Sequence, residues 1–270
     1  MTSLMLFRAR RLVLSVICVA GAAAAACGPA PTHLRYTMRL EMKPASTPMP
    51  PDPILGALGD VVAQSMVPGG MVEMTSTLGA EGMRLEWNKP LPGMPTGAVM
   101  IHRADGSTVL IDPTQKTYWK VATDSMTTMF PAGTKPKVTT SRTGQFETVQ
   151  GERAEKITFS IRLPLPIPDG VTLPPGMPTE VPMEGEAWVA PRYQKYLSGV
   201  ARTLPGLSSI GLDQLSTEGL QMKQILRSPI FGNQQLETLV TSVAEERTPP
   251  GRFVVPDGYR EVPAPAGMGR

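Results

Sequence analysis

Residues 32–42, with the sequence THLRYTMRLEM, alternate between apolar and polar side chains. Every second position is apolar, namely Leu34, Tyr36, Met38, Leu40 and Met42. Successive side chains of a β-strand point to opposite faces, so this period of two predicts a strand with one buried and one solvated face. The stretch therefore favours an antiparallel β-sheet, the kind of sheet that commonly exposes one face to water.

Strand patterns continue along the chain. The expected strands cover residues 71–77, 82–87, 98–103, 107–111, 116–121, 146–149, 155–161 and 185–190. Asp105-Gly106 is a strong signal for a tight hairpin between residues 98–103 and 107–111. Residues 219–229 and 234–246 fit two paired strands joined around Gly232-Asn233. The apolar spacing in residues 236–243 also fits a helix.

Two or three short helices are expected among these strands. Asp52-Pro53 is typical of a helix start, and apolar residues then recur at helical spacing as far as Met66. Residues 124–130 and 193–204 carry similar patterns. The helix after Asp52 can be a lid over a cavity, a membrane-touching face or a helix packed on the sheet. Six apolar residues of these helices are the candidate lining of a ligand cavity: Ile54, Leu58, Val62, Met66, Tyr196 and Val200.

The predicted fold class is mainly β (α+β), with a curved antiparallel sheet or half-open barrel and two or three short helices packed on or over it. Three proline-rich stretches, residues 44–53, 90–95 and 164–182, are expected to be stiff extended loops at the surface. The 17 methionines suit a deformable apolar cavity or an ordinary loosely filled core.

The N-terminal segment carries a targeting pattern. Three arginines at positions 8, 10 and 11 precede a short apolar run, and small residues lead to Cys27, which is typical of a secretory signal peptide. Cys27 after three alanines also resembles a bacterial lipobox, in which the cysteine is acylated. Ala24 and Ala26 equally satisfy ordinary signal peptidase. The expected organisation is signal peptide 1–26, anchor and tether 27–31, one β-rich domain 32–262 and tail 263–270.

Charge excludes one class of partner. The chain has 26 basic and 23 acidic residues, and the three arginines lie in the predicted signal peptide, which leaves 23 of each sign. The mature chain is formally neutral and has no basic cluster, so nucleic acid is not an expected partner. With Cys27 acylated, no cysteine remains for a disulfide.

Catalytic and metal-binding patterns are missing from the sequence. His33 and His102 are its two histidines, too few for a typical zinc site, and no nucleophile elbow, Walker loop or dinucleotide fingerprint occurs. His102 alternates with Met100 and is expected at the surface of a sheet. The carboxylate pairs Glu152/Glu155 and Glu184/Glu186 are expected to be solvated. No catalytic residue, cofactor or metal is therefore predicted.

The order of several segments resembles a family of bacterial envelope domains of unknown function. These segments are the alternating first strand, residues 109–118, Trp188-Val189-Ala190-Pro191 with the following tyrosine-containing helix, and the closing residues 253–259. That family is in turn similar to periplasmic lipoprotein carriers and outer-membrane lipoprotein receptors. The resemblance implies a half-open antiparallel barrel, closed by helices over an apolar cavity for acyl chains.

The sequence thus predicts a lipid-anchored envelope protein on the periplasmic face, with the outer membrane favoured over the inner. Without acylation it would be periplasmic or secreted. The first functional hypothesis is a non-enzymatic binder or carrier of an apolar ligand, such as an acyl chain or lipidated peptide. The second is an interaction module with a filled core that recruits an envelope protein through its proline-rich loops or sheet edge. The third, an esterase-like enzyme, would need His102 as its base.

Overall fold

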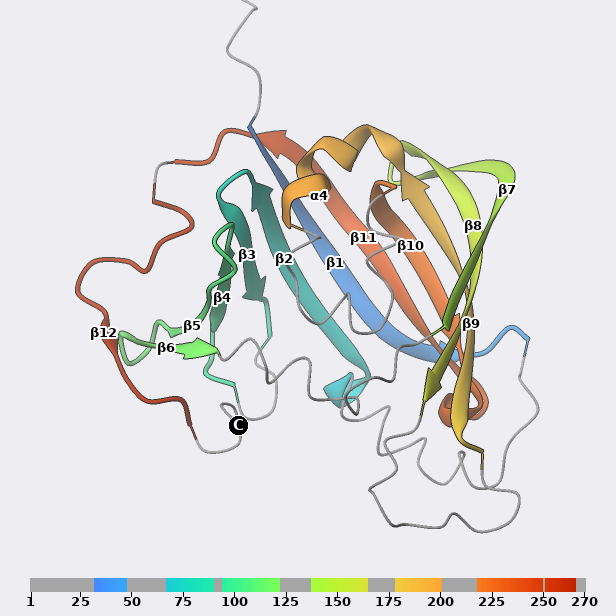
Figure 1. The fold of residues 1–270 in the computed structure, drawn as a ribbon, viewed down its shortest axis with the longest axis horizontal. Coiled ribbons are helices and arrows are strands. Elements are labelled where there is room, and N and C mark those ends of the chain that lie inside the picture. Colours follow the sequence, from blue (N-terminus) through green and yellow to red (C-terminus); the bar gives the residue numbers. More distant parts are fainter. Residues whose placement is uncertain are drawn as a thin grey trace, which may run out of the picture. The chain divides into compact units, whose positions relative to one another are not determined.

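The computed structural model describes residues 32–47, 67–89, 94–121, 137–164, 178–200, 218–249 and 251–265 (Figure 1). The chain divides into two units, Met1–Thr32 and His33–Arg270, and every described strand belongs to the second. The boundaries predicted at residues 26, 31 and 262 stay predictions. The expected helices at 53–66 and 124–130 lie outside the described residues.

Twelve strands account for most of the described residues. They are β1 (His33–Pro44), β2 (Met71–Gly79), β3 (Gly82–Trp87), β4 (Val99–Arg103), β5 (Thr108–Asp112), β6 (Thr117–Val121), β7 (Lys137–Val149), β8 (Glu152–Pro164), β9 (Glu180–Ala190), β10 (Leu220–Arg227), β11 (Gln234–Glu246) and β12 (Arg260–Glu261). The described helical elements are the 3-10 turns η1 (Pro68–Gly70), η2 (Pro191–Tyr193) and η3 (Pro229–Phe231) and the α-helix α4 (Gln194–Val200).

All twelve strands belong to one curled, open sheet in the order β12-β6-β5-β4-β3-β2-β1-β11-β10-β9-β8-β7 (Figure 1). Every pairing is antiparallel except that of β12 with β6. The sheet confirms the predicted fold class of a curved antiparallel sheet. In the described part of the chain, one short α-helix accompanies it.

The alternating stretch that predicts the fold forms a central strand. β1 pairs with β2 on one side and with β11 on the other, so a segment near the start of the chain joins one near its end. Leu34 and Tyr36 are buried, whereas Arg35 is exposed, as the period of two requires. The pattern thus identified both the strand and its buried face.

The hairpin at Asp105-Gly106 is confirmed. Gly106 has a φ of 85°, which a glycine adopts without strain. The Asp105 carboxylate accepts a hydrogen bond from the Ser107 backbone N–H at 2.8 Å. The Arg103 N–H donates to the Ser107 carbonyl at 2.9 Å and so closes the turn between β4 and β5.

Residues 234–246 form a strand, which excludes the helical alternative. β11 pairs along its whole length with β1, and Gln235–Leu239 also pair with β10. The backbone of β11 is thus paired on one side along its length and on both sides at residues 235–239. A helix with the same apolar spacing would leave β1 and β10 without this strand partner.

Two predicted boundaries were wrong. β7 begins at Lys137, nine residues before the expected start at 146. The early part of this strand was missed because residues 139–145 are all polar or glycine and carry no alternation. Strands also enter the predicted proline-rich loops, since Pro44, Pro164 and Pro182 all lie within strands. Pro182 is tolerated there because the pairing of β10 with β9 ends at Glu184, so no ladder bond to β10 is required of it.

The C-terminal segment packs on the small strands β4 and β5. Phe253 is buried in a cluster with Val99, Ile101, Val109 and Ile111. Its carbonyl accepts a hydrogen bond from Arg103 Nε at 3.3 Å. This segment stabilises one face of β4 and β5, and the opposite face of the sheet carries the candidate site.

Candidate apolar binding site

The inner face of the sheet is defined as the side to which Tyr36, Met38, Leu40 and Met42 of β1 point. Residues paired directly in an antiparallel ladder share a face, so the pairing register extends this face across the sheet. One row runs from β11 to β3 through Val240, Met38, Met74 and Trp87. A second row runs from β1 to β8 through Met42, Leu236, Leu226, Gly185 and Phe159.

Much of this inner face is only partly buried. Half-buried apolar side chains lie beside the fully buried cluster around Ile157, Phe159 and Ile161. They are Leu40, Met42, Met74, Trp87, Val138, Leu163, Met183 and Ile230. Apolar side chains in water carry a free-energy cost that scales with their exposed area. The inner face is therefore an apolar surface that can gain from further burial.

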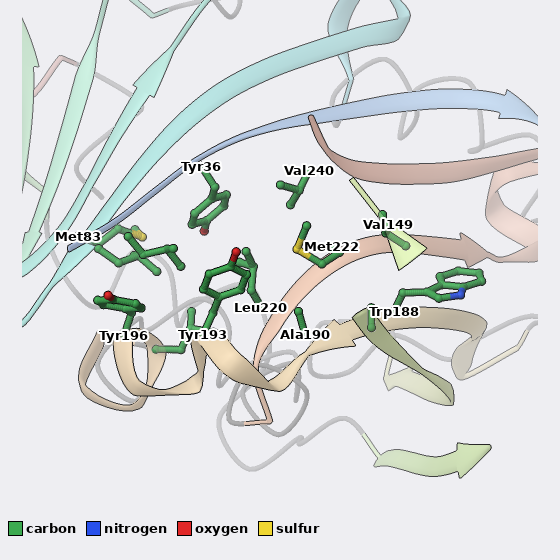
Figure 2. Close-up of a cluster of buried hydrophobic side chains, with 14 of the residues drawn as sticks. Tyr36, Met83, Val149, Trp188, Ala190, Tyr193, Tyr196, Leu220, Met222 and Val240 are labelled. Atoms are coloured by element: carbon green, nitrogen blue, oxygen red, sulfur yellow. The ribbon is translucent and has the colours of Figure 1, made fainter. Parts of the chain in front are cut away.

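The segment formed by η2 and α4 packs on one end of the inner face. α4 contacts β2 and β3, and its Tyr196 and Leu197 join a buried cluster with Leu34 and Leu78. Figure 2 shows Tyr193 and Tyr196 extending from this segment toward the sheet, where Tyr36 extends from β1. Burial raises the pKa of Tyr36 above its usual value, an effect partly offset by its hydrogen bond with Ser76. Three tyrosines thus close this end of the apolar face.

A charged network holds this helical segment to β11 and β8. Glu245 accepts hydrogen bonds from Tyr196 Oη at 2.8 Å and from Arg192 Nη2 at 3.1 Å. Lys195 Nζ lies 2.8 Å from the same carboxylate, and Arg192 also pairs with Glu152. These donors, Lys195 first and then Tyr196, lower the pKa of Glu245 to about 2. The ionised Glu245 therefore stabilises the docked position of α4.

We expect Glu245→Gln to lower the free energy of unfolding at pH 7 by about 1 kcal/mol, because the network is partly exposed and solvent screens it. Since the folded-state pKa of Glu245 lies below its ordinary 4.5, the stabilisation is complete above about pH 5. It is lost as the pH falls toward 2. Urea unfolding between pH 2 and 7 checks this, and the variant should show a shallower loss of stability with acid. Equal slopes for both proteins would contradict this role of Glu245.

The predicted cavity-lining residues are placed only in part. Tyr196 is buried on the inner face, 7% exposed, and Val200 lies in the last turn of α4. The other four candidates, Ile54, Leu58, Val62 and Met66, lie outside the described residues. Lining of a ligand cavity by these six stays a prediction. The half-buried Met74, Trp87 and Met183 were not singled out from the sequence, although the alternation within residues 71–77 and 82–87 marks one of their faces.

His102 is not the surface residue predicted from the sequence. It is 1% exposed, and its Nδ1 lies 2.8 Å from the Thr108 hydroxyl, across the β4–β5 hairpin. The prediction was wrong because His102 pairs directly with Met83 and so shares its face of the sheet. Met83 belongs to the buried cluster that contains Leu34 and Leu78. The ring lies on the apolar side of its strand, where the Thr108 hydroxyl meets its need for a polar partner.

One predicted carboxylate environment was also wrong. Glu155 is 8% exposed, because it shares the inner face with Val189, and Arg142 Nη1 lies 2.6 Å from it. Glu152 and Glu186 also have partners, Arg192 and Lys156 respectively. Glu184 is exposed, as predicted. Three of these four carboxylates therefore form ion pairs.

Two further properties concern the described residues alone. Among them, no three His, Cys, Asp or Glu side chains come together as metal ligands would. None of their helices has the length and apolar character needed to cross a membrane.

Comparison with known proteins finds no similar sequence and a structural match of low similarity. No protein-family model matches the sequence, and no curated protein is similar to it. Among solved structures, the chain is similar to a crystal structure of the LolA superfamily protein NE2245 from Nitrosomonas europaea. The match covers 84% of this chain and 91% of that one, with 8% sequence identity and a TM-score of 0.31. The pairing of its own strands therefore defines the class of this protein: a β protein built on one open, curled antiparallel sheet.

Proposed function

We propose that this chain is an envelope lipoprotein that binds or carries an apolar ligand, an acyl chain or a lipidated peptide, against the inner face of its sheet. The observation that carries the proposal is the group of half-buried methionine, leucine and tryptophan side chains on that face. The site would act by burial alone, without a catalytic residue or a cofactor.

Apolar burial is sufficient to hold such a ligand. Each 100 Å² of apolar surface removed from water contributes about 2.5 kcal/mol, so an acyl chain lying along two or three strands needs no charged partner. Met42, Met74 and Met183 suit this task because methionine is flexible and polarizable and adapts to ligands of irregular shape.

The expected anchor would keep such a site close to a membrane. Six residue steps lead from Cys27 to His33, the first residue of β1, and can span at most about 22 Å. An acylated Cys27 would thus hold the sheet next to the periplasmic face of a membrane, which we propose is the outer one. The neutral mature chain needs no electrostatic attraction to reach that position.

The test is native mass spectrometry and lipid extraction of the chain produced in a bacterial periplasm with Cys27→Ser, which removes the chain's own acyl anchor. We expect stoichiometric adducts of acyl-chain mass. Leu40→Asp should reduce these adducts by about tenfold or more, because a carboxylate on the inner face must lose its water on ligand binding. Val254→Asp is the matched control, since Val254 is an exposed apolar residue.

A ligand-free mass from protein that unfolds cooperatively in urea would overturn the proposal. It would favour the alternative function, an interaction module with a filled core. β7, the last strand of the sheet among the described residues, would then be the first surface to examine by crosslinking, because all but two of its thirteen residues are exposed.

A further inference from the structure

A hollow of about 310 Å³ lies on the outer face of the sheet, the side opposite the half-buried methionines. Its residues belong to β7, β8, β9 and β10 (Figure 1). One row of paired residues crosses it, namely Thr139, Ser160, Glu184 and Arg227. The row lies on the outer face because Arg227 also pairs with Gln235, which pairs with Lys43 of β1. The hollow is thus separate from the proposed apolar site.

A second row of paired residues, one step along the strands, completes the hollow. It consists of Ser141, Thr158 and Glu186. The two rows together present four hydroxyls, two carboxylates and one guanidinium at the regular spacing of the strands. Each hydroxyl both donates and accepts hydrogen bonds, the carboxylates accept, and the guanidinium donates. Such a grid matches a ligand that carries many hydroxyl groups.

Arg227 lacks a strong partner within the described part of the chain. Its Nε is shielded from solvent and has no hydrogen-bond partner there. One of its Nη atoms donates to Ser46 Oγ at the long distance of 3.5 Å. The guanidinium lines the hollow, and its Nη atoms make no other hydrogen bond to a described residue, so they can donate to a ligand oxygen there. Arg227 is therefore a donor prepared for a ligand.

Glu184 is the opposite charge across from Arg227, yet the two do not form an ion pair. Their residues are directly paired between β9 and β10, but no ion pair joins Glu184 to any described residue. The carboxylate is exposed at the hollow. Cation and anion are thus both available to a ligand that lies between them.

The charges of the hollow favour a neutral ligand over an anion. The positive charge of Arg227 offsets the negative charge of Glu184, although the two side chains form no ion pair. Lys156 Nζ lies 3.4 Å from the Glu186 carboxylate and offsets its charge. Among the described residues of the hollow, a phosphate or carboxylate would meet one guanidinium and two carboxylates, whereas a neutral sugar would meet charge-assisted donors and acceptors without repulsion. We propose that this hollow binds a neutral sugar, with Arg227 donating to sugar oxygens and Glu184 accepting from sugar hydroxyls. The volume is at the lower end of the range for small-molecule sites and suits a short oligosaccharide.

The test is an NMR titration of the full chain in lauryldimethylamine oxide, a detergent that carries neither sugar nor phosphate. Chitotriose, maltotriose and mannotriose, three neutral trisaccharides, are added to about 10 mM each. We expect at least one to shift the Arg227 Nε–H resonance and the amide resonances of β8 and β9 in a saturable way. Inorganic phosphate should leave these resonances unchanged.

Variants distinguish this site from general surface contact. Arg227→Gln and Glu184→Gln should each weaken the sugar by about tenfold, the effect of losing one charge-assisted hydrogen bond. Arg162→Gln is the matched control: Arg162 is an exposed arginine on the same face of β8 but not part of the hollow. Binding by none of the three sugars, binding of phosphate instead, or equal weakening by Arg162→Gln would each overturn the proposal.

Discussion

Gly185→Ala is expected to lower the free energy of unfolding by about 3 kcal/mol, because this sheet position has no room for a methyl group. A Cβ atom on Gly185 would collide with Phe159 Cζ and would lie 2.6 Å from the carbonyl oxygen of Ile225. The Phe159 ring cannot easily move aside, since it is 4% exposed among packed apolar side chains. Urea unfolding of the variant measures the loss.

A double-mutant cycle identifies the source of that cost. In a Phe159→Ala background, Gly185→Ala should cost clearly less, because only the contact with the Ile225 carbonyl remains. Glu184→Ala is the control. Glu184 is the exposed residue next to Gly185, so its substitution should change the free energy of unfolding by less than about 0.5 kcal/mol. If Gly185→Ala lowers the free energy of unfolding equally in both backgrounds, the collision with the Phe159 ring is not the source of the loss.

Gly185 also illustrates what the sequence could not predict. The strand at 185–190 was predicted, but a glycine at its start gives no sign of which residue lies over it. That information depends on the pairing of β8 with β9, which brings Phe159 opposite Gly185. Pairing between strands is a long-range property, and the long predicted loop between these two strands left their register open.

Where one face of a strand is buried, the sequence was a good guide. β1 carries the predicted alternation, β2 and β3 form at the predicted places, and the Asp105-Gly106 turn joins β4 and β5 as expected. Alternation failed for β7, whose residues from Thr139 to Thr148 are exposed on both faces. Its existence as a strand depends on the ladder it forms with β8, which the polar sequence does not reveal.

The candidate sites show the same limit in their polar residues. Local sequence marks His102 and Glu155 as ordinary polar positions of strands, yet both lie on the inner face and are buried. Their partners, Thr108 and Arg142, stand six and thirteen residues away, across hairpins. A polar residue on the apolar side of a strand can be predicted only when the face of that strand is known, and such a residue then requires a partner.

The two faces of the sheet have opposite chemistry, and this contrast follows from alternation along the strands. In β8, Ile157, Phe159 and Ile161 are buried on the inner face, while Thr158 and Ser160 belong to the outer hollow. A binder of apolar ligands on one face and of sugars on the other would suit an envelope, where acyl chains and glycans meet. The two proposals are nevertheless tested separately, since Leu40→Asp and Arg227→Gln alter different faces.

Cys27→Ser is expected to move the chain from the membrane fraction to the soluble fraction and to abolish incorporation of labelled fatty acid. Each buried methylene of an acyl chain contributes about 0.8 kcal/mol, so two or three chains hold a protein on a membrane durably, and a serine cannot carry them. The balance of 23 basic and 23 acidic residues after residue 26 leaves no net charge to hold the variant at an anionic surface. A high-salt wash should therefore release neither protein further.

The two cysteines of the chain make this experiment selective. Cys18 lies within the predicted signal peptide, so Cys18→Ser should leave both the label and the membrane fraction unchanged. Ala24 and Ala26 are retained in the Cys27 variant and satisfy the small-residue rule of ordinary signal peptidase, so cleavage and export should continue without the anchor. A natural chain that is unlabelled and soluble would show that ordinary signal peptidase processes it. The proposed apolar site would then have to work free in the periplasm, where a carrier can diffuse between membranes, and not at a fixed distance from one.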